Sequence, residues 1–310
     1  MKKILVTGAN GFLGRHVIPL LLKHNYHVYA VDNNITMGSE KKENLSWHEC
    51  NLFDPEDKKS LFSKIKPTHL LHLAWYTVPK KYWTAPENVL WVKASIELFF
   101  NFLENGGRRA VFAGTCAEYN WDYELLSEDK TPLLPKTLYG KCKNSLNTML
   151  GALAEQKDIS YAWGRIFFLY GSGENKERLI PEVINSLLKG KEVNCSHGRQ
   201  VRDFLHVEDV ADAFVTLVES NLRGSVNIAS GQPATLKQII YKIAEKLDRK
   251  DLIRLNAVPS SKSEPLRLIA DNKRLKNELK WKPKYNLDSG LEKTIKWWKK
   301  EISGYKKEKM

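Results

Sequence analysis

Residues 3–14 read Lys3-Ile4-Leu5-Val6-Thr7-Gly8-Ala9-Asn10-Gly11-Phe12-Leu13-Gly14, and this segment sets the architecture that we expect for the chain. Its first residues are mostly apolar or β-branched, which predicts a buried β-strand. Three glycines follow, and after them the apolar pattern of Val17 to Leu22 predicts a helix. A strand, a glycine turn and a helix start place backbone N–H groups and a positive helix end where a diphosphate can bind.

The three glycines have distinct expected tasks in this turn. Gly8 allows the tight turn, Gly11 allows a phosphate to approach closely, and Gly14 allows the helix to pack closely on the strand. Their spacing is G-x-x-G-x-x-G, whereas the common dinucleotide fingerprint is G-x-G-x-x-G. The turn therefore needs support from other parts of the sequence.

An acidic residue at the end of the second predicted strand gives that support. The strand His27 to Val31 is followed by Asp32, about 20 residues beyond the last glycine, where a carboxylate would accept the hydroxyls of an adenosine ribose. A carboxylate there repels a 2′-phosphate, and residues 33–37 contain no arginine, so NAD is favoured over NADP. The alternative is a turn-forming Asp before Asn33-Asn34.

The next segments alternate between strand and helix patterns. Such alternation predicts parallel strands with crossover helices, that is, an α/β Rossmann-like doubly wound sheet. We expect an NAD-binding domain over residues 1–169 and a smaller C-terminal α/β domain for the substrate over 170–310. The predicted elements are the strands 45–49, 68–73, 110–113 and 162–169 and the helices 55–65, 86–104, 136–155 and 207–218.

A hydroxyl, a phenol and an ammonium group follow the predicted strand 110–113. Thr115 ends its apolar run, while Tyr139 and Lys143 lie four residues apart on a helix whose other face is apolar. A nearby ammonium group lowers the pKa of a phenol by roughly one to three units, which would allow Tyr139 to exchange a proton near neutral pH. The alternative is an ordinary exposed Tyr/Lys pair.

Composition narrows the classes of partner. A net charge of +13 would suit nucleic acid, a membrane surface or a polyanionic small molecule. The lysines are scattered or gathered at residues 296–309, and no basic stripe is interleaved with aromatic residues, so we expect neither nucleic acid nor membrane as a partner. We expect a cytoplasmic protein without metal sites, whose cysteines are reduced and packed; these are Cys50, Cys116, Cys142 and Cys195.

Together these motifs resemble the extended short-chain dehydrogenase/reductase family of nucleotide-sugar epimerases, dehydratases and ketoreductases. The resemblance covers nearly the whole chain and implies that Tyr139 exchanges a proton with the substrate oxygen, Lys143 holds the phenolate and the nicotinamide ribose, and Thr115 hydrogen-bonds the same oxygen. It also implies a set of cofactor contacts. These are Gly8, Asn10, Gly11, Phe12, Leu13, Gly14, Asp32, Asn51, Leu52, Leu73, Ala74, Trp75, Tyr139 and Lys143.

The resemblance implies substrate contacts as well, with several departures. Trp75 stands where the family has a second alanine, and Trp75-Tyr76-Thr77 would line the hexose pocket or form an aromatic core plug. Glu118 would face the sugar or pack beneath it. Arg202 resembles the phosphate-clamping arginine, with a surface ion pair to Asp203 or Glu208 as the alternative, and Lys262 or Arg267 would have to serve as the second clamp. The usual asparagine after Arg165 is Phe168.

These departures point to a reaction. Dehydratases of the family carry an Asp-Glu pair after the catalytic Thr, and here Cys116-Ala117 follows Thr115, so water elimination is not expected. The sequence most resembles the branch of CDP-abequose synthase and dTDP-6-deoxytalose 4-dehydrogenase, which implies an NAD(P)-dependent oxidoreductase at C4 of a nucleotide-linked deoxyhexose. The alternatives are a 4-epimerase with retained NAD and a catalytically silent NAD-binding scaffold. The broad apolar surface of the helix 86–104 indicates a homodimer through this helix and the helix 136–155.

Overall fold

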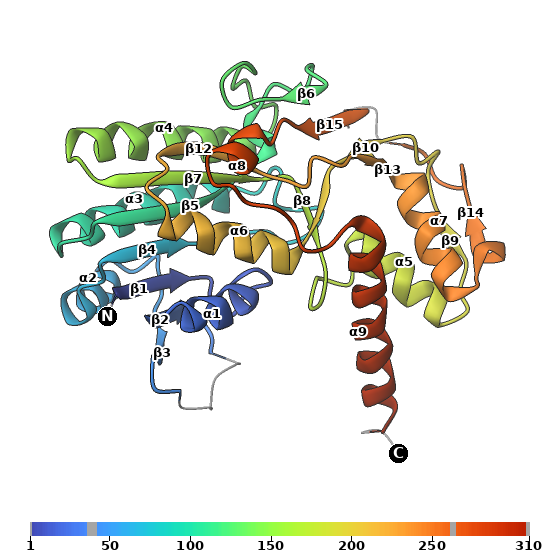
Figure 1. The fold of residues 1–310 in the computed structure, drawn as a ribbon, viewed down its shortest axis with the longest axis horizontal. Helices are drawn as coiled ribbons and strands as arrows, with labels where there is room; N and C mark the ends of the chain where they lie inside the picture. The colour runs from blue at the N-terminus through green and yellow to red at the C-terminus, as the bar shows by residue number, and fades with distance from the viewer. Residues whose placement is uncertain (1, 36–41, 261–264, 308–310) are drawn as a thin grey trace.

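The computed structural model describes residues 2–35, 42–260 and 265–307, and its centre is one large parallel sheet (Figure 1). Seven strands lie in the order β12-β7-β5-β4-β1-β2-β3, and each neighbouring pair is parallel. This is the strand order of a dinucleotide-binding doubly wound sheet, with its reversal beside β1. The strands are β1 (Lys2–Thr7), β2 (Tyr26–Asp32), β3 (Leu45–Glu49), β4 (His69–His72), β5 (Arg109–Thr115), β7 (Ser160–Ile166) and β12 (Gly224–Ile228).

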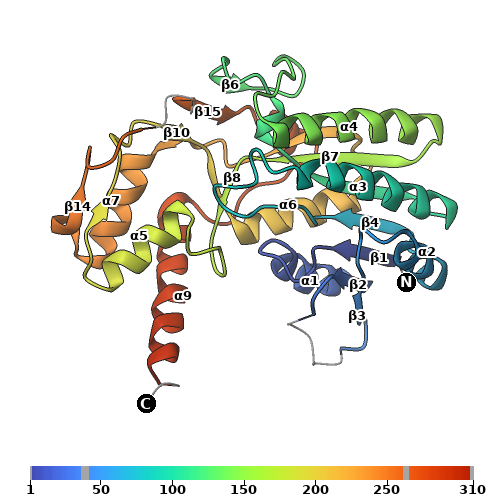
Figure 2. The ribbon, with the colours of Figure 1, turned by 180° about the vertical axis from the view of Figure 1, so that it is seen from behind.

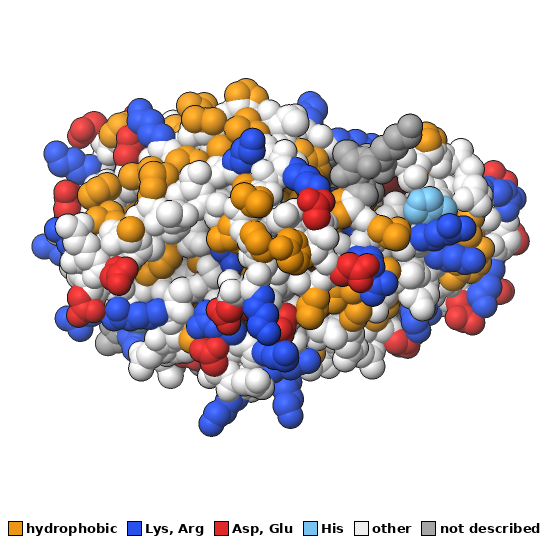
Figure 3. All heavy atoms as spheres, turned by 90° about the horizontal axis from the view of Figure 1, so that it is seen from above, with side chains coloured by type: hydrophobic (Ala, Val, Ile, Leu, Met, Phe, Trp, Pro, Cys, Tyr) orange, Lys and Arg blue, Asp and Glu red, His pale blue; other side chains and the backbone are white. Residues whose placement is uncertain are grey.

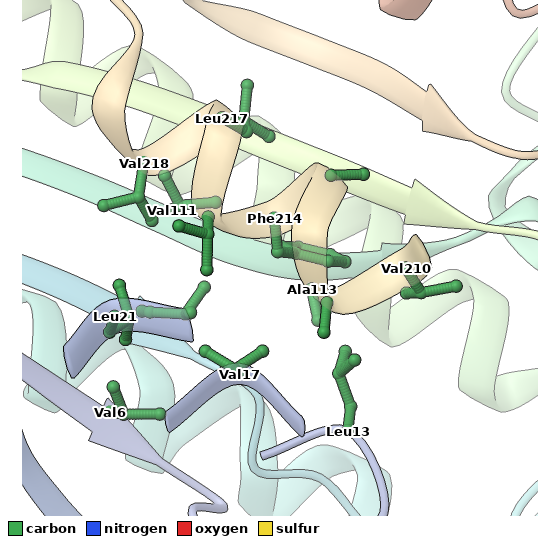
Figure 4. Packing of buried hydrophobic residues seen from close by; sticks show 14 of the residues in the cluster. Val6, Leu13, Val17, Leu21, Val111, Ala113, Val210, Phe214, Leu217 and Val218 are labelled. Atoms are coloured by element: carbon green, nitrogen blue, oxygen red, sulfur yellow. The ribbon is translucent and has the colours of Figure 1, made fainter. Parts of the chain in front are cut away.

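Helices cover both faces of this sheet. Alternate residues of a strand point to opposite faces, and in β5 Ala110 and Phe112 pack with α2 (Pro55–Ile65), α3 (Glu87–Glu104) and α4 (Leu138–Gln156). Val111 and Ala113 point to the other face, where they meet α1 (Gly14–Lys23) and α6 (Val207–Glu219), as Figure 4 shows for Val17, Leu21 and Phe214. The predicted doubly wound fold is therefore confirmed.

Local signals fix the start of the helix that carries Tyr139 and Lys143. Thr137 adopts an extended backbone and its hydroxyl accepts a hydrogen bond from Gly140 N at 3.1 Å. This is an N-cap, which satisfies one of the free N–H groups of the first turn. Tyr139 consequently lies in the first turn of α4 and Lys143 one turn later.

Most of the remaining elements form a smaller part of the molecule with a core of its own, on the right in Figure 1 and on the left in Figure 2. Two two-stranded sheets and one four-stranded sheet, β13-β10-β15-β6, accompany its helices. The strands are β6 (Leu125–Leu126), β8 (Phe168–Tyr170), β9 (Val193–Asn194), β10 (Val201–Arg202), β11 (Phe204–His206), β13 (Ala234–Thr235), β14 (Ile253–Arg254) and β15 (Arg267–Ala270). The helices are α5 (Leu179–Leu188), α7 (Leu236–Leu247), α8 (Lys273–Asn277) and α9 (Leu287–Lys307), with 3-10 turns η1 (Cys116–Glu118) and η2 (Lys250–Leu252). Of these, β6, η1 and α8 lie beside the large sheet and its helices.

The structure differs from the sequence prediction at the predicted strand 162–169. This run forms two strands: β7 ends at Ile166, and β8 pairs with β11 in another sheet. Phe167 N still donates to Ile228 O at 3.3 Å, whereas Phe168 N donates to Asp203 O at 3.2 Å, so the chain changes partner between these residues. The later segments α6 and β12 then return to the large sheet.

Charged and hydrophobic side chains mix on the surface, and the four cysteines lie inside the protein. In Figure 3, which views the face with α4 and β6, Lys and Arg side chains are dispersed among hydrophobic and acidic ones. Cys50, Cys116, Cys142 and Cys195 are buried and free. Within the described ranges, no helix has both the length and the apolar character needed to cross a bilayer.

Candidate active site

The site lies where the parallel strands end. β1, β2, β4 and β5 end at Thr7, Asp32, His72 and Thr115, and their carboxyl ends share one edge of the sheet. In open α/β sheets, ligands bind outside this edge at the point where the strand order reverses. Here that point lies between β1 and β4.

The glycine turn after β1 packs against the segment that follows β4. Gly8 has a φ of +67°, and a Cβ built on it would lie 2.8 Å from Ala74 N, so the turn and Leu73-Ala74 are in close contact. A Cβ on Gly14 would collide with the carbonyl oxygen of Gly8. Leu13, the N-cap of α1, gives no side-chain cap. Arg15 N and His16 N already donate to Gly11 O and Leu13 O. Within the described residues, the amides just ahead of them, from Phe12 to Gly14, are the ones left for a diphosphate, and the turn fits a dinucleotide.

Asp32 connects to this turn directly. Its Oδ2 accepts from Asn10 N at 3.0 Å, and its Oδ1 accepts from Asn33 N at 2.9 Å. The second bond is the turn-forming role considered above, and the first joins Asp32 to the glycine turn. Asn51 and Leu52 follow β3 on the same edge; Leu52 is buried and Asn51 is exposed.

Thr115, Tyr139 and Lys143 come together beyond β5. Thr115 is the last residue of β5 and the N-cap of η1, and its side chain lies beside Tyr139. The Nζ of Lys143 donates to Ala113 O at 2.8 Å and lies 3.7 Å from the centroid of the Trp75 ring. All three predicted catalytic side chains are buried at this edge of the sheet.

The electrostatics differ from the expected ones. Burial raises the pKa of Tyr139 above its ordinary value, the neighbouring Tyr82 adds to that rise, and the side chain of Thr115 counteracts part of it. Burial likewise lowers the pKa of Lys143 to about 7, and the negative charge of Glu118 opposes that change. The expected net lowering of the Tyr139 pKa is not found, because burial of the phenol outweighs the other effects. The ammonium group of Lys143 binds Ala113 O and lies over the Trp75 ring.

An aromatic cluster covers Tyr139, and sequence reasoning missed most of it. The ring centroids of Tyr82 and Trp83 lie 5.0 and 5.9 Å from that of Tyr139, and Trp121 packs edge-on against Trp83 at 5.9 Å. Tyr139 N also donates to Trp83 O at 3.1 Å. The dense aromatic composition of residues 75–83 was the signal that could have indicated this cover.

Trp75, Tyr76 and Thr77 lie at the edge of the cluster. Trp75 Nε1 donates to the buried Asn88 Oδ1 at 2.8 Å, and Tyr76 packs partly buried against the cluster. Thr77 O accepts from Arg178 Nη2 at 3.2 Å, and that guanidinium lies 5.1 Å above the Tyr82 ring. Arg178 is a further basic side chain near the site that the sequence did not single out.

Glu118, expected either to face the sugar or to pack beneath it, lies inside the protein. Its side chain is completely buried, its Oε1 accepts from Thr115 N at 2.8 Å, and its Oε2 accepts from Arg165 Nε at 2.7 Å. Of the two roles considered for Glu118, packing beneath the site is the one that these contacts support. The same ion pair engages Arg165.

The residues predicted to bind phosphate differ in burial and in their contacts. Arg202 is buried, donates to Val201 O at 2.9 Å and lies 5.4 Å over the Phe168 ring, near the thiol of Cys116. The two acids considered as its surface partners bind other groups: Asp203 accepts from Ser230 and Gly231, and Glu208 pairs with Lys293. Arg267 is exposed and pairs with Glu124 at 3.3 Å, as a surface ion pair would. Lys262 lies outside the described residues.

Comparisons with known proteins agree with this site. A model of the NAD dependent epimerase/dehydratase family matches residues 4–229. The chain is 27% identical to UDP-glucuronic acid decarboxylase 1 of Danio rerio, over 97% of this chain and 73% of that protein. It is 27% identical to dTDP-4-dehydro-6-deoxyglucose reductase of Escherichia coli (94% and 96% covered) and 24% identical to CDP-abequose synthase of Salmonella typhimurium (94% and 97%).

A solved structure supports the same relationship. The UDP-glucose 4-epimerase of Thermotoga maritima, determined with UDP-glucose, superposes with a TM-score of 0.86 at 26% identity. The match covers 97% of this chain and 99% of that one. The fold is therefore shared over almost the whole length, including the smaller part.

Proposed function

The chain belongs to the NAD dependent epimerase/dehydratase family, and we propose that it is an NAD-dependent oxidoreductase acting at C4 of a nucleotide-linked deoxyhexose. The family is NAD-dependent, and the relatives compared above are enzymes of nucleotide sugars. Two of them, a 4-dehydro-6-deoxyglucose reductase and CDP-abequose synthase, belong to deoxysugar chemistry.

The two residues after Thr115 favour oxidation or reduction of the sugar over removal of water. The two positions after Thr115, where dehydratases of the family keep an acid pair, hold Cys116 and Ala117. Ala117 has no ionisable group, and burial raises the pKa of the Cys116 thiol to about 12, so it stays protonated at neutral pH. Tyr139 is then the proton-exchanging group beside Thr115, which suits oxidation or reduction of one carbon–oxygen bond.

The residues of the site suit this chemistry. NAD, when bound, supplies or accepts the hydride. The glycine turn and the start of α1 would hold its diphosphate, and Asp32 its adenosine ribose. Tyr139 would exchange a proton with the sugar oxygen, Thr115 would donate a hydrogen bond to the same oxygen, and Lys143 would place a positive charge beside both. The aromatic cluster would exclude water from this step.

A 4-epimerase with retained NAD is the second candidate, and Asp32 favours it. A carboxylate at this position opposes the 2′-phosphate of NADP, whereas net reduction in cells more often draws on NADPH. Epimerisation consumes no cofactor, because the same carbon is oxidised and then reduced again. An NAD-specific site therefore fits this reaction at least as well.

Exposed apolar side chains support a homodimer. On α3, Val89, Leu90 and Phe100 are 55%, 54% and 45% exposed, and on α4 Met149 is 44% exposed. A surface hollow is lined in part by Leu90 and Phe53. We propose that α3 and α4 of one subunit pack on those of a second copy, because this contact would remove these apolar side chains from water.

The proposed reaction is tested with purified protein, NAD or NADH, and a panel of nucleotide sugars and their 4-keto derivatives. Stoichiometric change in the absorbance of reduced nicotinamide indicates net redox, and isomer conversion without it indicates epimerisation. The Tyr139→Phe variant should lose about 10²-fold or more of the turnover while still binding NAD. Tyr241→Phe, on the remote α7, is the matched control. Equal turnover by Tyr139→Phe and the parent would reject the enzymatic role.

A further inference from the structure

We propose that Glu118 is a positioning residue of the site. Its bond to the backbone N–H of Thr115 orients the threonine hydroxyl, and its negative charge keeps the side chain of Lys143 protonated. This inference rests on the proposed catalytic roles of Thr115 and Lys143. It concerns a carboxylate that touches neither cofactor nor substrate.

The carboxylate of Glu118 is fully hydrogen-bonded inside the protein. Its Oε1 accepts from Thr115 N at 2.8 Å and from Trp163 Nε1 at 2.9 Å, and its Oε2 accepts from Arg165 Nε at 2.7 Å. Glu118, Trp163 and Arg165 are almost completely buried. A buried carboxylate is costly unless it is paired and hydrogen-bonded, and this one is both.

The network beyond Arg165 anchors the pair to a second strand. Arg165 Nη1 donates to Tyr119 OH at 3.0 Å, and Tyr119 OH donates to Asn227 Oδ1 at 2.7 Å. Arg165 belongs to β7 and Asn227 to β12, two neighbouring strands of the large sheet. Glu118 is therefore fixed against the large sheet, and its bond to Thr115 N fixes the backbone of Thr115 in turn.

The hydrogen bonds within η1 connect Glu118 to the orientation of the Thr115 hydroxyl. Thr115 and Glu118 form a capping box, in which Glu118 accepts from Thr115 N while Thr115 Oγ1 accepts from Ala117 N at 3.2 Å. The amide of Ala117 occupies one lone pair of the hydroxyl, so the hydroxyl hydrogen is directed elsewhere. Tyr139 and the thiol of Cys116 both lie beside it, since the Thr115 side chain affects the pKa of each.

Trp163 separates the carboxylate from Lys143. The indole donates its N–H to Glu118, and its ring lies 5.7 Å from the Nζ of Lys143. A Cβ on Gly114 would overlap Trp163 Nε1, so glycine at this position admits the indole. Because the protein interior between Glu118 and Lys143 screens charges weakly, the carboxylate can act on the ammonium group over several ångströms.

Glu118 is the one resolved charge that favours the protonated form of Lys143. The pKa of Lys143, lowered to about 7 by burial, would fall further without it. Glu118 also raises the pKa of Tyr139, so its removal lowers the pKa of both groups.

Apart from Arg165, the other ionisable groups around Lys143 are neutral at neutral pH. Burial lowers the pKa of His72 on β4 well below 6.5, and raises those of Tyr161 on β7, Cys116 on η1 and Tyr139 on α4. The polar side chains that α3 buries nearby, Asn88 and Ser95, carry no charge. Arg165 on β7 is paired to Glu118 itself.

Two variants separate charge from geometry. Glu118→Gln keeps the length and loses the charge, and Glu118→Asp keeps the charge and shortens the reach to Thr115 N. Glu128→Gln is the matched control, because Glu128 is another partly buried acid of the same network, bonded to Asn227 N at 2.7 Å. Glu118→Gln alone leaves the charge of Arg165 unpaired, which could prevent folding. In that case the double variant Glu118→Gln/Arg165→Met replaces it in the experiment.

The charge is read from Lys143 itself. Cyanate carbamylates neutral amines, and mass spectrometry of the Lys143 peptide across pH gives the midpoint of its reactivity without any sugar substrate. Glu118→Gln and the double variant should move that midpoint to lower pH by about one pH unit, which is about fivefold faster labelling near pH 6. Glu118→Asp and Glu128→Gln should keep the parental midpoint. A parental midpoint in Glu118→Gln overturns the role of the charge.

The orientation is read from turnover. Glu118→Asp should keep the parental pH profile and lower kcat by roughly ten- to hundredfold, because the Thr115 hydroxyl is misplaced. A parental kcat in Glu118→Asp overturns the orienting role. If the parent turns over no nucleotide sugar, the proposed function fails, and the cyanate midpoint still decides the electrostatic part of this inference.

Discussion

The ammonium nitrogen of Lys143 lies 3.7 Å from the centroid of the Trp75 ring. The indole is fixed on its far side, because its Nε1 donates to Asn88 Oδ1 at 2.8 Å and Asn88 Nδ2 donates in turn to Tyr82 O and Ala85 O. A cation above an aromatic face gains electrostatic energy that rises as water is removed. Trp75 thus replaces solvent around a buried charge.

Replacing Trp75 should therefore lower turnover, by an amount that depends on how much of the indole is lost. Trp75→Phe keeps an aromatic face and loses the bond to Asn88, whereas Trp75→Leu loses both. We expect turnover to fall by about twofold to thirtyfold in Trp75→Leu and by less in Trp75→Phe, in line with a cation–π energy of roughly 0.5 to 2 kcal/mol. Initial rates at saturating substrate measure this. Equal rates in the leucine variant and the parent would show that the indole only fills space.

Burial of Lys143 should make stability depend on pH. The pKa of Lys143 is about 7 in the folded protein against 10.5 for a free side chain, so the unfolded chain binds more protons between these values. The contribution of Lys143 to the free energy of unfolding therefore rises with pH through this window, by at most about 1.4 kcal/mol per pH unit. Below pH 7 the full cost of the buried charge is present.

Lys143→Met removes that cost and should be more stable than the parent at pH 6, with a difference that shrinks towards pH 9. Urea unfolding of cofactor-free protein at several pH values measures it. Lys141→Met, an exposed position on the same helix, is the control and should show no such trend. A parent-to-variant difference that does not change with pH would contradict the assignment.

Much of the fold could be predicted because local patterns determine it. Residues 45–49 and 55–65 form a strand and a helix with the predicted bounds, and α4 begins at Leu138 because Thr137 caps it. The change from β7 to β8 could not be read in this way. No turn residue marks it, and it depends on pairing with β11, more than thirty residues later.

The site was predictable at the level of its chemical groups, and less so in its electrostatics. The spacing of Tyr139 and Lys143 indicated the pair, yet the direction of the Tyr139 pKa shift depends on rings from residues 75–83 that close over it. Glu118 illustrates the same limit. Its burial depends on Trp163 and Arg165, which lie 45 and 47 residues away in sequence, both on β7, the strand beside β5.

The cofactor preference should depend on the charge of Asp32. Asp32→Asn keeps an acceptor for Asn10 N and loses the negative charge, whereas Asp32→Ala loses both. If the carboxylate binds the ribose hydroxyls, both variants should bind NAD about 10- to 100-fold more weakly and discriminate less against NADP. Titration calorimetry with each dinucleotide measures this. Parental affinity and selectivity in Asp32→Asn would instead assign Asp32 to the turn alone.

The proposed dimer can be tested at the centre of its apolar surface. Leu90 is 54% exposed on α3 and lines a hollow together with Ala94 and Phe53, so a second copy would bury it. Leu90→Glu places a charge there that cannot be buried without a partner, and we expect it to shift the protein from dimer to monomer. Light scattering after size exclusion gives the mass directly. Val258→Glu, at a position 43% exposed in the smaller part of the molecule, is the matched control and should keep the parental mass. A monomeric parent would reject the dimer, and a dimeric Leu90→Glu variant would move the interface away from α3.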